Sequence, residues 1–347
     1  MKIEQIDRNF LVKSDIARPG ITYFSVMDPP FTVHGLIREG EKWVRMPSCV
    51  AEQVNPGVKD LNACTAGGRV RFKTSSPYIA IAVKYNVMMK MPHFAFTGSI
   101  GFDLYTDGVY AGSYINGGDD REFESVIDLY TREERTITIH FPLYSGVDEL
   151  FIGLEAGCSL EKAPDYAIPE PVVFYGSSIT QGACASRPGT CSDNLLSRLL
   201  DCEHVNLGFS GSARGESAMA EYLSGLKMRA FVLDYDYNAP SPEHLLATHE
   251  PLFRRVRAAQ PELPVIMLSR PKYHLAEGEE ERVSIIRQTY EHALADGDKN
   301  VYFLPGPSLI EPRMIETATV DNCHPNDSGF VCMAYAVKPV LEKIFHS

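Results

Sequence analysis

The stretch PVVFYGSSIT (171–180) joins a short apolar run to a glycine and two adjacent serines. An apolar run of this length, bounded by a turn, is typical of a buried strand. Four comparable apolar runs follow in the chain: HVNLGF (204–209), RAFVLDY (229–235), PVIMLS (264–269) and VYFLPG (301–306). Helical patterns occur between the later of these runs, such as ERVSIIRQTYEHALA (281–295). Strands that alternate with helices indicate a parallel sheet covered on both faces, so this half of the chain is predicted to be α/β.

The preceding half has a different period. Between residues 68 and 156 apolar and polar residues alternate, as they do in half-buried strands, in GRVRFKT (68–74), YIAIAVKY (78–85) and TITIHF (136–141). The pair Asp107-Gly108 separates two such runs and predicts a tight hairpin. No convincing helical pattern interrupts this region. We therefore expect an antiparallel sandwich or jelly roll of roughly 160 residues.

Three prolines lie close together between the two halves, in EKAPDYAIPEP (161–171). Proline restricts its own φ angle and disfavours helix at the residue before it, so the stretch is interpreted as a linker. The sequence thus predicts an N-terminal β-sandwich domain over residues 1–165 and a C-terminal catalytic domain over residues 170–347.

Composition narrows the classes of partner and cofactor. The 347 residues carry a formal net charge of -12, which disfavours nucleic acid and anionic membranes as partners. Eight cysteines occur without a CxxC pair, and no HExxH motif is present, so neither a metal nor an organic cofactor is expected. The N-terminal residues 1–13 show no apolar signal-peptide core, and we expect a cytoplasmic protein with reduced thiols.

Polar residues follow several of the predicted parallel strands, at the edge where α/β sheets bind ligands. Ser177 and Ser178 follow the first strand, and Asn238 follows the third. Asp321 and His324 precede the last helix. A serine becomes nucleophilic when a histidine held by a carboxylate takes its proton, and the oxyanion that forms needs hydrogen-bond donors. This spacing allows Asp321 to orient His324 toward a serine.

These segments resemble the conserved blocks of the GDSL, or SGNH, esterases. GSSIT (176–180) is similar to the first block, which implies that Ser178 is the nucleophile and that Ser177 stands in the place of the family's aspartate. NLGFSG (206–211) is similar to the second block and DYDYNA (234–239) to the third. The resemblance implies an oxyanion hole formed by Ser178, Gly211 and Asn238. DNCH (321–324) is similar to the fifth block and implies Asp321 as acid and His324 as base.

The N-terminal half extends the resemblance. GFDLY (101–105) is similar to the signature of a β-rich domain that precedes one branch of these esterases, and SITQGACASRPG (178–189) is also similar to that branch. The third block departs from the family pattern, because Asp236 replaces its glycine and Ala239 its aspartate. These two departures concern the geometry of that loop more than the role of Asn238.

Each feature alone also has a structural explanation. A Gly-Ser-Ser sequence can be only a turn, and Gly211 can be a position that needs a positive φ angle. Asn238 can hydrogen-bond its own backbone, and Asp321 with His324 can cap the final helix. Four blocks in the expected order, each after its expected strand, favour the esterase.

Two interpretations remain open for each of two further residues. Arg187 is a candidate substrate-binding residue beside Ser178, or else it forms an ion pair that braces its loop. Cys323, beside the base, is either an alternative nucleophile or buried filler.

The resulting hypothesis is a two-domain serine esterase. Its C-terminal domain is a flavodoxin-like three-layer α/β/α SGNH domain, and a jelly-roll-like β-sandwich precedes it. The expected substrate is a small-molecule or oligosaccharide ester with a small acyl group, foremost acetyl, on a carbohydrate. The alternatives are a lipid esterase, a thioesterase or an acyltransferase with the same residues, or an inactive carbohydrate-binding protein. Homo-oligomerisation is left open.

Overall fold

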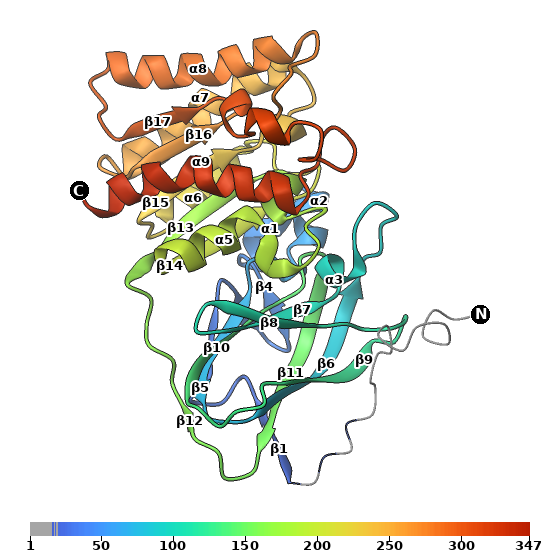
Figure 1. Ribbon diagram of the computed structural model, residues 1–347. Coiled ribbons are helices and arrows are strands. Elements are labelled where there is room, and N and C mark those ends of the chain that lie inside the picture. The colour runs from blue at the N-terminus through green and yellow to red at the C-terminus, as the bar shows by residue number, and fades with distance from the viewer. Residues whose placement is uncertain (1–15, 17, 19) are drawn as a thin grey trace.

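The computed structural model describes residue 16, residue 18 and residues 20–347. The N-terminal stretch 1–13, on which the expectation about a signal peptide depends, lies outside the described residues. Figure 1 shows an antiparallel β domain below and an α/β domain above it, stacked along the long axis of the molecule. Among the residues that the structure describes, no helix is both long enough and apolar enough to cross a bilayer.

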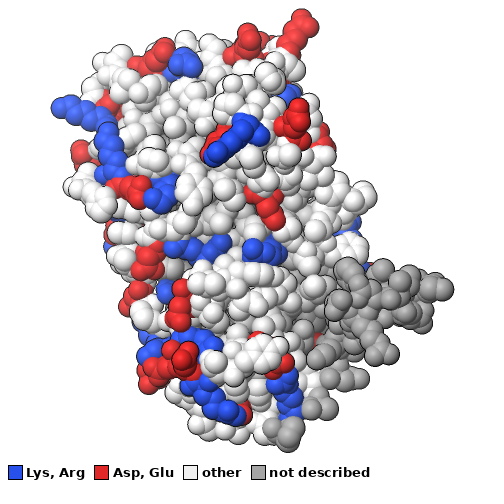
Figure 2. All heavy atoms as spheres, viewed as in Figure 1, with Lys and Arg blue, Asp and Glu red and all other residues white. Residues whose placement is uncertain are grey.

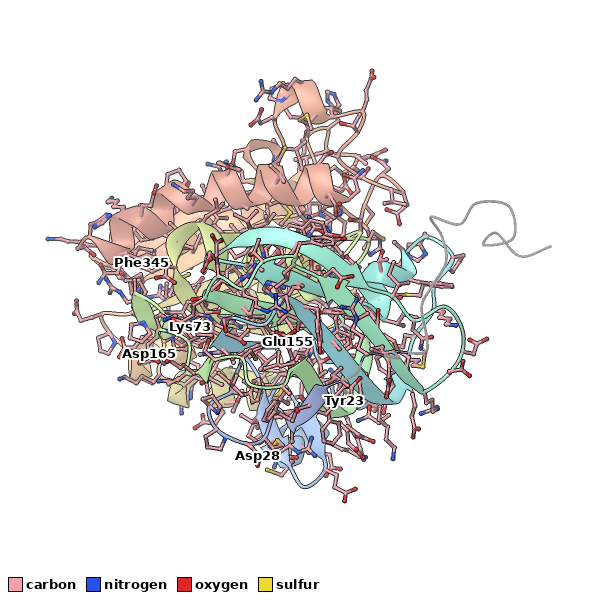
Figure 3. The ribbon with its side chains drawn as sticks, turned by 60° about the horizontal axis from the view of Figure 1, so that its bottom comes forward. Tyr23, Asp28, Lys73, Glu155, Asp165 and Phe345 are labelled. Carbon is pink, nitrogen blue, oxygen red and sulfur yellow. The ribbon has the colours of Figure 1, made fainter. Side chains whose placement is uncertain are left out.

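Two antiparallel sheets form the β domain. The four-stranded sheet has the order β1 (Ile21–Ser25), β11 (Ser145–Glu155), β6 (Tyr78–Met88) and β9 (Glu122–Asp128). The second sheet has the order β12 (Leu160–Glu161), β5 (Arg69–Thr74), β10 (Arg135–His140), β7 (Phe102–Thr106) and β8 (Val109–Tyr114), with β2 (Thr32–His34) also paired to β5. A small ribbon is formed by β3 (Ile37–Glu39) and β4 (Lys42–Val44). Figure 3 views this end of the molecule, with Tyr23 of β1 and Glu155 of β11 in view.

The alternating pattern explains the core of this domain. Phe72, Ile81 and Ile139 lie on inward-facing positions of three strands and are fully buried in one cluster. The predicted hairpin is confirmed, because β7 pairs with β8 and Asp107 and Gly108 both have positive φ angles (49° and 80°). The expectation that no helix interrupts residues 68–156 is wrong. A single turn, α3 (Phe96–Ser99), lies there, and it is too short to produce a helical period in the sequence.

The α/β domain confirms the predicted parallel sheet. Its order is β14 (Cys202–Gly208), β13 (Ile168–Gly176), β15 (Ala230–Asp234), β16 (Val265–Leu268) and β17 (Val301–Leu304). In sequence order this is 2-1-3-4-5, the doubly wound order of flavodoxin-like folds. Helices α5 (Ser192–Leu200) and α9 (Asp327–Phe345) cover one face. Helices α6 (Ser217–Gly225), α7 (Pro242–Ala259) and α8 (Glu279–Ala295) cover the other face.

Shorter helical segments complete the chain. In the β domain these are α1 (Ser48–Val54) and α2 (Pro56–Leu61). The α/β domain adds α4 (Ser178–Gln181) and the 3-10 turns η3 (Pro188–Thr190), η4 (Asp236–Asn238), η5 (Gly306–Ser308) and η6 (Pro312–Met314). On the face shown in Figure 2, acidic and basic side chains are mixed.

The predicted linker 161–171 is partly strand. Strand β13 begins at Ile168 and includes Pro169 and Pro171. Its pairing with β14 is irregular between Ile168 and Val172, so the prolines fall where the ladder is already interrupted and a missing N–H costs little. Proline content alone therefore overstated the length of the linker.

Buried arginines of the β domain fix it to strand β14 and the residue that follows this strand. The Arg45 guanidinium donates to the carbonyl of Gly208 and lies 4.3 Å from the centre of the Phe209 ring. Arg69, whose side chain is fully buried, pairs with Glu203. These contacts hold the two domains together along strand β14, from Glu203 near its start to Gly208 at its end.

Candidate active site

The carboxyl ends of β13, β14 and β15 bring the predicted site segments to one edge of the sheet. The strand order reverses between β13 and its neighbours, and such a switch point opens a crevice. Ser178 begins the helix after β13, and Asn238 ends the turn η4 after β15. The segment 321–326 reaches the same edge immediately before α9.

The two adjacent serines have different environments. Ser177 is extended (φ -82°, ψ -164°) and 1% exposed, and its Oγ caps α4 by accepting the N–H of Ile179 at 3.2 Å. Ser178 is the first residue of α4, so its N–H has no acceptor within the helix. Gly176 is needed before them, because a Cβ there would lie 2.2 Å from the carbonyl oxygen of Asp234. The turn thus buries the Ser177 hydroxyl and leaves the Ser178 hydroxyl in contact with His324.

Ser178, His324 and Asp321 form one chain of hydrogen bonds. Ser178 Oγ lies 2.9 Å from His324 Nε2, and His324 Nδ1 lies 2.8 Å from Asp321 Oδ2. The second oxygen of Asp321 accepts the backbone N–H of Cys323 at 3.0 Å and that of His324 at 2.7 Å. The carboxylate therefore holds both the turn and the imidazole.

The protonation of this chain follows from its contacts. Partial burial acts to raise the pKa of Asp321, but the hydrogen bonds from the backbone and imidazole of His324 outweigh it and lower the pKa below its ordinary value. An ionised Asp321 accepts the proton of His324 Nδ1, which leaves the Nε2 lone pair directed at the Ser178 hydroxyl. This arrangement is suited to removing the proton from Ser178.

Gly211 and Asn238 are hydrogen-bonded to each other, so they do not provide two free donors for an oxyanion. The Gly211 N–H donates to Asn238 Oδ1 at 3.0 Å, and Asn238 Nδ2 donates to the Phe209 carbonyl at 2.9 Å. These two bonds fix the orientation of the amide, and they leave one Nδ2 hydrogen available. Contrary to the expectation from sequence, the Gly211 N–H is already engaged.

The departures in the third block are explained by packing. Asp236, which stands in place of the family's glycine, is buried and forms ion pairs with Arg270 at 2.9 Å and Arg282 at 3.5 Å. Ala239, in place of the aspartate, is 3% exposed and packs in the core of the α6–α8 side. The altered loop is therefore anchored by Arg270 and Arg282, and Asn238 at its end bonds to Gly211 and Phe209.

Arg187 is used to brace the two domains. Its guanidinium pairs with Asp103 at 3.0 Å, contacts the Tyr105 hydroxyl and lies 3.8 Å from the centre of the Tyr110 ring. Asp103 also accepts the N–H of Gly189 at 2.9 Å. The structure shows the ion pair that was one of the two alternatives for Arg187. The GFDLY stretch thereby supplies the partners of the loop that follows α4.

Two residues of the β domain reach the site and were missed in the sequence. The Tyr144 hydroxyl lies 3.4 Å from the carbonyl oxygen of Ser178. His93, on the connection between β6 and α3, places its ring centre 5.8 Å from that of His324. Ligand atoms of His93, Cys184 and His324 lie within 4.8 Å of one another, and those of Asp321, Cys323 and His324 do so as well. These are the metal-capable groups among the described residues.

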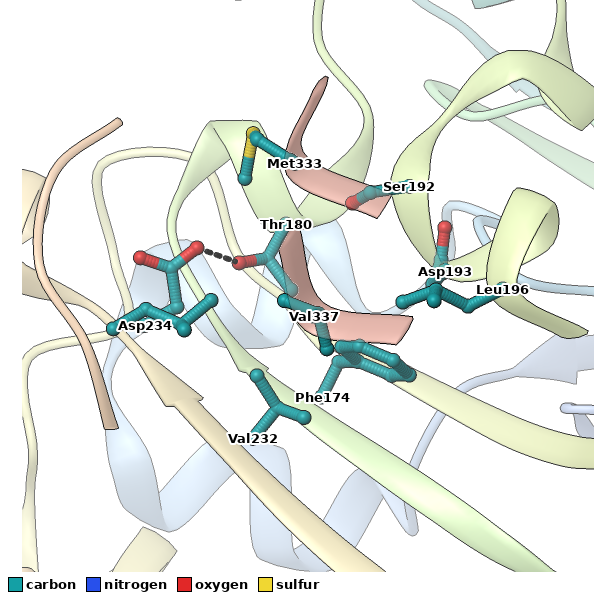
Figure 4. Close-up of a pocket in the computed structure, with 10 residues that line it drawn as sticks. Phe174, Thr180, Ser192, Asp193, Leu196, Val232, Asp234, Met333 and Val337 are labelled. Carbon is teal, nitrogen blue, oxygen red and sulfur yellow. Dashed lines mark hydrogen bonds between the residues drawn. The ribbon is translucent and has the colours of Figure 1, made fainter. Parts of the chain in front are cut away.

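A small cavity lies beneath α4, on the side of the sheet covered by α5 and α9. Its lining includes Phe174, Thr180, Asp193, Asp234, Met333 and Val337. Figure 4 shows Thr180 and Asp234 joined by a hydrogen bond of 3.1 Å between Oγ1 and Oδ2. Burial raises the pKa of Asp234 to about 8. The hydrogen bond from Thr180 acts to lower this pKa, and the nearby charge of Asp236 acts to raise it further. Burial therefore favours the neutral, protonated form of Asp234.

The Asp234→Asn variant is expected to be more stable than the parent protein, with a gain that grows as the pH rises. The folded-state pKa lies above the ordinary value of 3.8, so the native protein binds more protons than the unfolded chain between pH 3.8 and about 8. Stability is lost as the pH rises through this window. Removing the charge should raise Tm by several °C, on the order of 5 °C, at pH 8.

Calorimetry of Asp234→Asn at pH 5 and pH 8 checks this expectation. Asp165→Asn is the matched control, because Asp165 is exposed and pairs with the exposed Lys162. A gain in Tm that is equal at both pH values would contradict the assignment of a buried neutral acid.

Comparisons with known proteins cover both domains. Residues 169–342 match the model of the GDSL-like lipase/acylhydrolase family. Residues 21–160 match the GxDLY family, the N-terminus of SGNH-hydrolase-type esterases. No curated protein matches the chain.

Solved structures share the whole two-domain layout. A GDSL-like lipase candidate from Bacteroides ovatus ATCC 8483 is 31% identical, with a TM-score of 0.84 over 94% of this chain and 98% of its own. The salicylyl-acyltransferase of a tetracycline biosynthetic pathway is 20% identical, with a TM-score of 0.78 over 94% and 98%. An acetyl xylan esterase from the rumen bacterium Butyrivibrio proteoclasticus is 10% identical, with a TM-score of 0.62 over 94% and 99%.

Proposed function

The chain belongs to the GDSL-like lipase/acylhydrolase family and is an esterase, and we propose that it hydrolyses small acyl esters, foremost acetyl esters of carbohydrates. The observation that carries the proposal is the unbroken chain of hydrogen bonds from Ser178 through His324 to Asp321. The preference for an acetylated sugar is supported by the similarity in fold to an acetyl xylan esterase.

In the proposed reaction Ser178 Oγ attacks the ester carbonyl while His324 Nε2 takes its proton. Asp321 stabilises the imidazolium that results. His324 then returns the proton to the leaving alcohol, and an acyl group remains on Ser178. Water, activated by the same histidine, hydrolyses this acyl-enzyme and restores the serine.

The oxyanion of each tetrahedral intermediate needs donors that are free before the reaction. The Ser178 N–H meets this condition as the first amide of α4, and Asn238 Nδ2 retains one unused hydrogen. We propose these two donors as the oxyanion hole. Gly211 is assigned the supporting role of orienting the Asn238 amide, because its N–H is bonded to Asn238 Oδ1.

Acyl transfer is the second candidate function. A neighbour with the same two-domain layout is a salicylyl-acyltransferase. An acyl-enzyme on Ser178 can pass its acyl group to an alcohol instead of water when the acceptor is held in the site.

A series of esters tests the proposal. With p-nitrophenyl esters, we expect kcat/KM for the acetate to exceed that for the octanoate by at least ~10-fold, since one methylene is worth ~1–3 kcal/mol in a pocket that fits the acyl group. Acetylated oligosaccharides should release acetate. A preference for the octanoate would contradict the small-acyl assignment, and transfer to an added alcohol that outpaces hydrolysis would favour the acyltransferase.

A further inference from the structure

We propose that His93, Cys184 and His324 form a binding site for a thiophilic divalent cation of the zinc class, and that a bound cation inhibits the enzyme. The three side chains come from separate parts of the chain. His93 lies on the β6–α3 connection of the β domain, Cys184 follows α4, and His324 follows β17. The inhibition rests on the proposed function, whereas the binding does not.

The donor atoms have the right types and nearly the right spacing. Imidazole nitrogen and thiolate sulfur are the ligands that zinc prefers, at about 2.0–2.1 Å and about 2.3 Å respectively. Tetrahedral geometry then separates donor atoms by about 3.3–3.6 Å. In the structure all three lie within 4.8 Å of one another, so movements of about 1 Å would close the site around a cation.

His93 is the ligand best able to make this adjustment. Its side chain is exposed, but its neighbours in the chain are anchored. Phe94 is 4% exposed and meets the Tyr144 ring edge-on at 5.3 Å, and the Met89 N–H donates to the Tyr144 carbonyl at 3.3 Å. The backbone therefore presents the imidazole to the site while the side chain retains rotational freedom.

Cys184 has an unusual backbone conformation. Its φ angle is +71°, a left-handed region that glycine occupies at much lower cost. A cation that binds here displaces the thiol proton to solvent and takes the thiolate as ligand. Asp321 would then help to balance the added positive charge.

Binding of a cation to His324 is incompatible with the proposed reaction. One ring nitrogen is bonded to Ser178 and the other to Asp321. A cation on either nitrogen must replace one of these two bonds, and it would occupy the lone pair that takes the proton or break the contact that orients the ring. Occupancy of the site therefore removes the base.

The competing group of Asp321, Cys323 and His324 is a poorer site. Both oxygens of Asp321 are already occupied, one by His324 Nδ1 and the other by two backbone N–H groups. A cation there would have to break the turn that supports His324. The two groups share His324 but differ in their cysteine, and this difference makes them separable by experiment.

Cobalt(II) tests binding without reference to activity. Metal-free protein titrated with Co²⁺ should develop the near-ultraviolet absorption of a thiolate–cobalt bond, and Cys184→Ser should abolish this band. Cys323→Ser is the matched control and should leave the band unchanged. No thiolate band in the wild-type protein, or a band that persists in Cys184→Ser and vanishes in Cys323→Ser, would overturn the proposed site.

Zinc inhibition tests the consequence on the same variants. With a p-nitrophenyl ester as substrate, free Zn²⁺ should inhibit the wild-type enzyme, and both Cys184→Ser and His93→Ala should need at least ~10-fold more Zn²⁺ for the same inhibition. The basal activity of Cys184→Ser should stay within a few fold of wild type. Equal sensitivity of all three proteins would refute the mechanism. If the protein hydrolyses no ester at all, the cobalt band still decides whether the site exists.

Discussion

The Ser178→Ala variant is expected to lose on the order of 10⁴-fold or more in kcat for ester hydrolysis, with its fold intact. Alanine removes the atom that would form the acyl-enzyme, and the hydroxyl of the adjacent Ser177 is not expected to replace it. Ser177 is 1% exposed and its Oγ caps α4 by accepting the N–H of Ile179, so its hydroxyl is buried and already bonded. The side chain of Ser178 is not part of the core, so melting temperatures should change little.

A fluorophosphonate probe distinguishes the two serines directly. Peptide mass spectrometry should find the adduct on Ser178 in the wild-type protein and none in Ser178→Ala. Ser177→Ala is the matched control: it loses a helix cap, which costs about 1 kcal/mol, but should still be labelled. An adduct on Ser177 would show that the wrong hydroxyl has been chosen.

Much of the fold could be predicted because its elements carry periodic signals. Strand β5 alternates between the two sheet faces, and the parallel strands read as short apolar runs because helices bury both of their faces. Features without a period were missed or misjudged. The one-turn helix α3 left no pattern, and the prolines at the start of β13 suggested a linker where an irregular strand is present.

Those parts of the candidate site that lie in short local motifs could be predicted from the sequence. Ser178, Asn238, Asp321 and His324 each lie in a recognisable block after a strand or before a helix. Contacts between distant loops could not be predicted. The bond from Gly211 to Asn238, the pairing of Arg187 with Asp103 and the approach of His93 to His324 depend on how separate segments pack, and no residue spacing records that packing.

The GFDLY stretch shows how one family signature can serve the site without taking part in it. Asp103 is fully buried and binds both the Arg187 guanidinium and the Gly189 N–H. Both partners lie on the loop that follows the proposed nucleophile. The β domain therefore constrains the loop beside Ser178.

The His324→Ala variant is expected to lower kcat by at least ~10³-fold with little change in KM, because it removes stabilisation that arises only in the transition state. His324 is the only described residue that contacts both Ser178 and Asp321 through hydrogen bonds of its side chain, at 2.9 Å and 2.8 Å. Without the imidazole, Ser178 keeps its proton and attacks slowly. Labelling by the fluorophosphonate should slow to a similar degree, which separates a chemical defect from loss of substrate binding.

Asp321→Asn and Cys323→Ala serve as comparisons for this variant. Asparagine retains an oxygen that can accept the backbone N–H groups of Cys323 and His324, so the turn should survive, but it cannot stabilise an imidazolium as a carboxylate does. Its loss in kcat should therefore be large but smaller than that of His324→Ala. Cys323→Ala should retain nearly full turnover, because the Ser178–His324–Asp321 chain bypasses its side chain. Near-normal turnover in His324→Ala, or a loss in Cys323→Ala that matches it, would contradict the assignment of His324 as the base and direct attention to the Cys323 thiol instead.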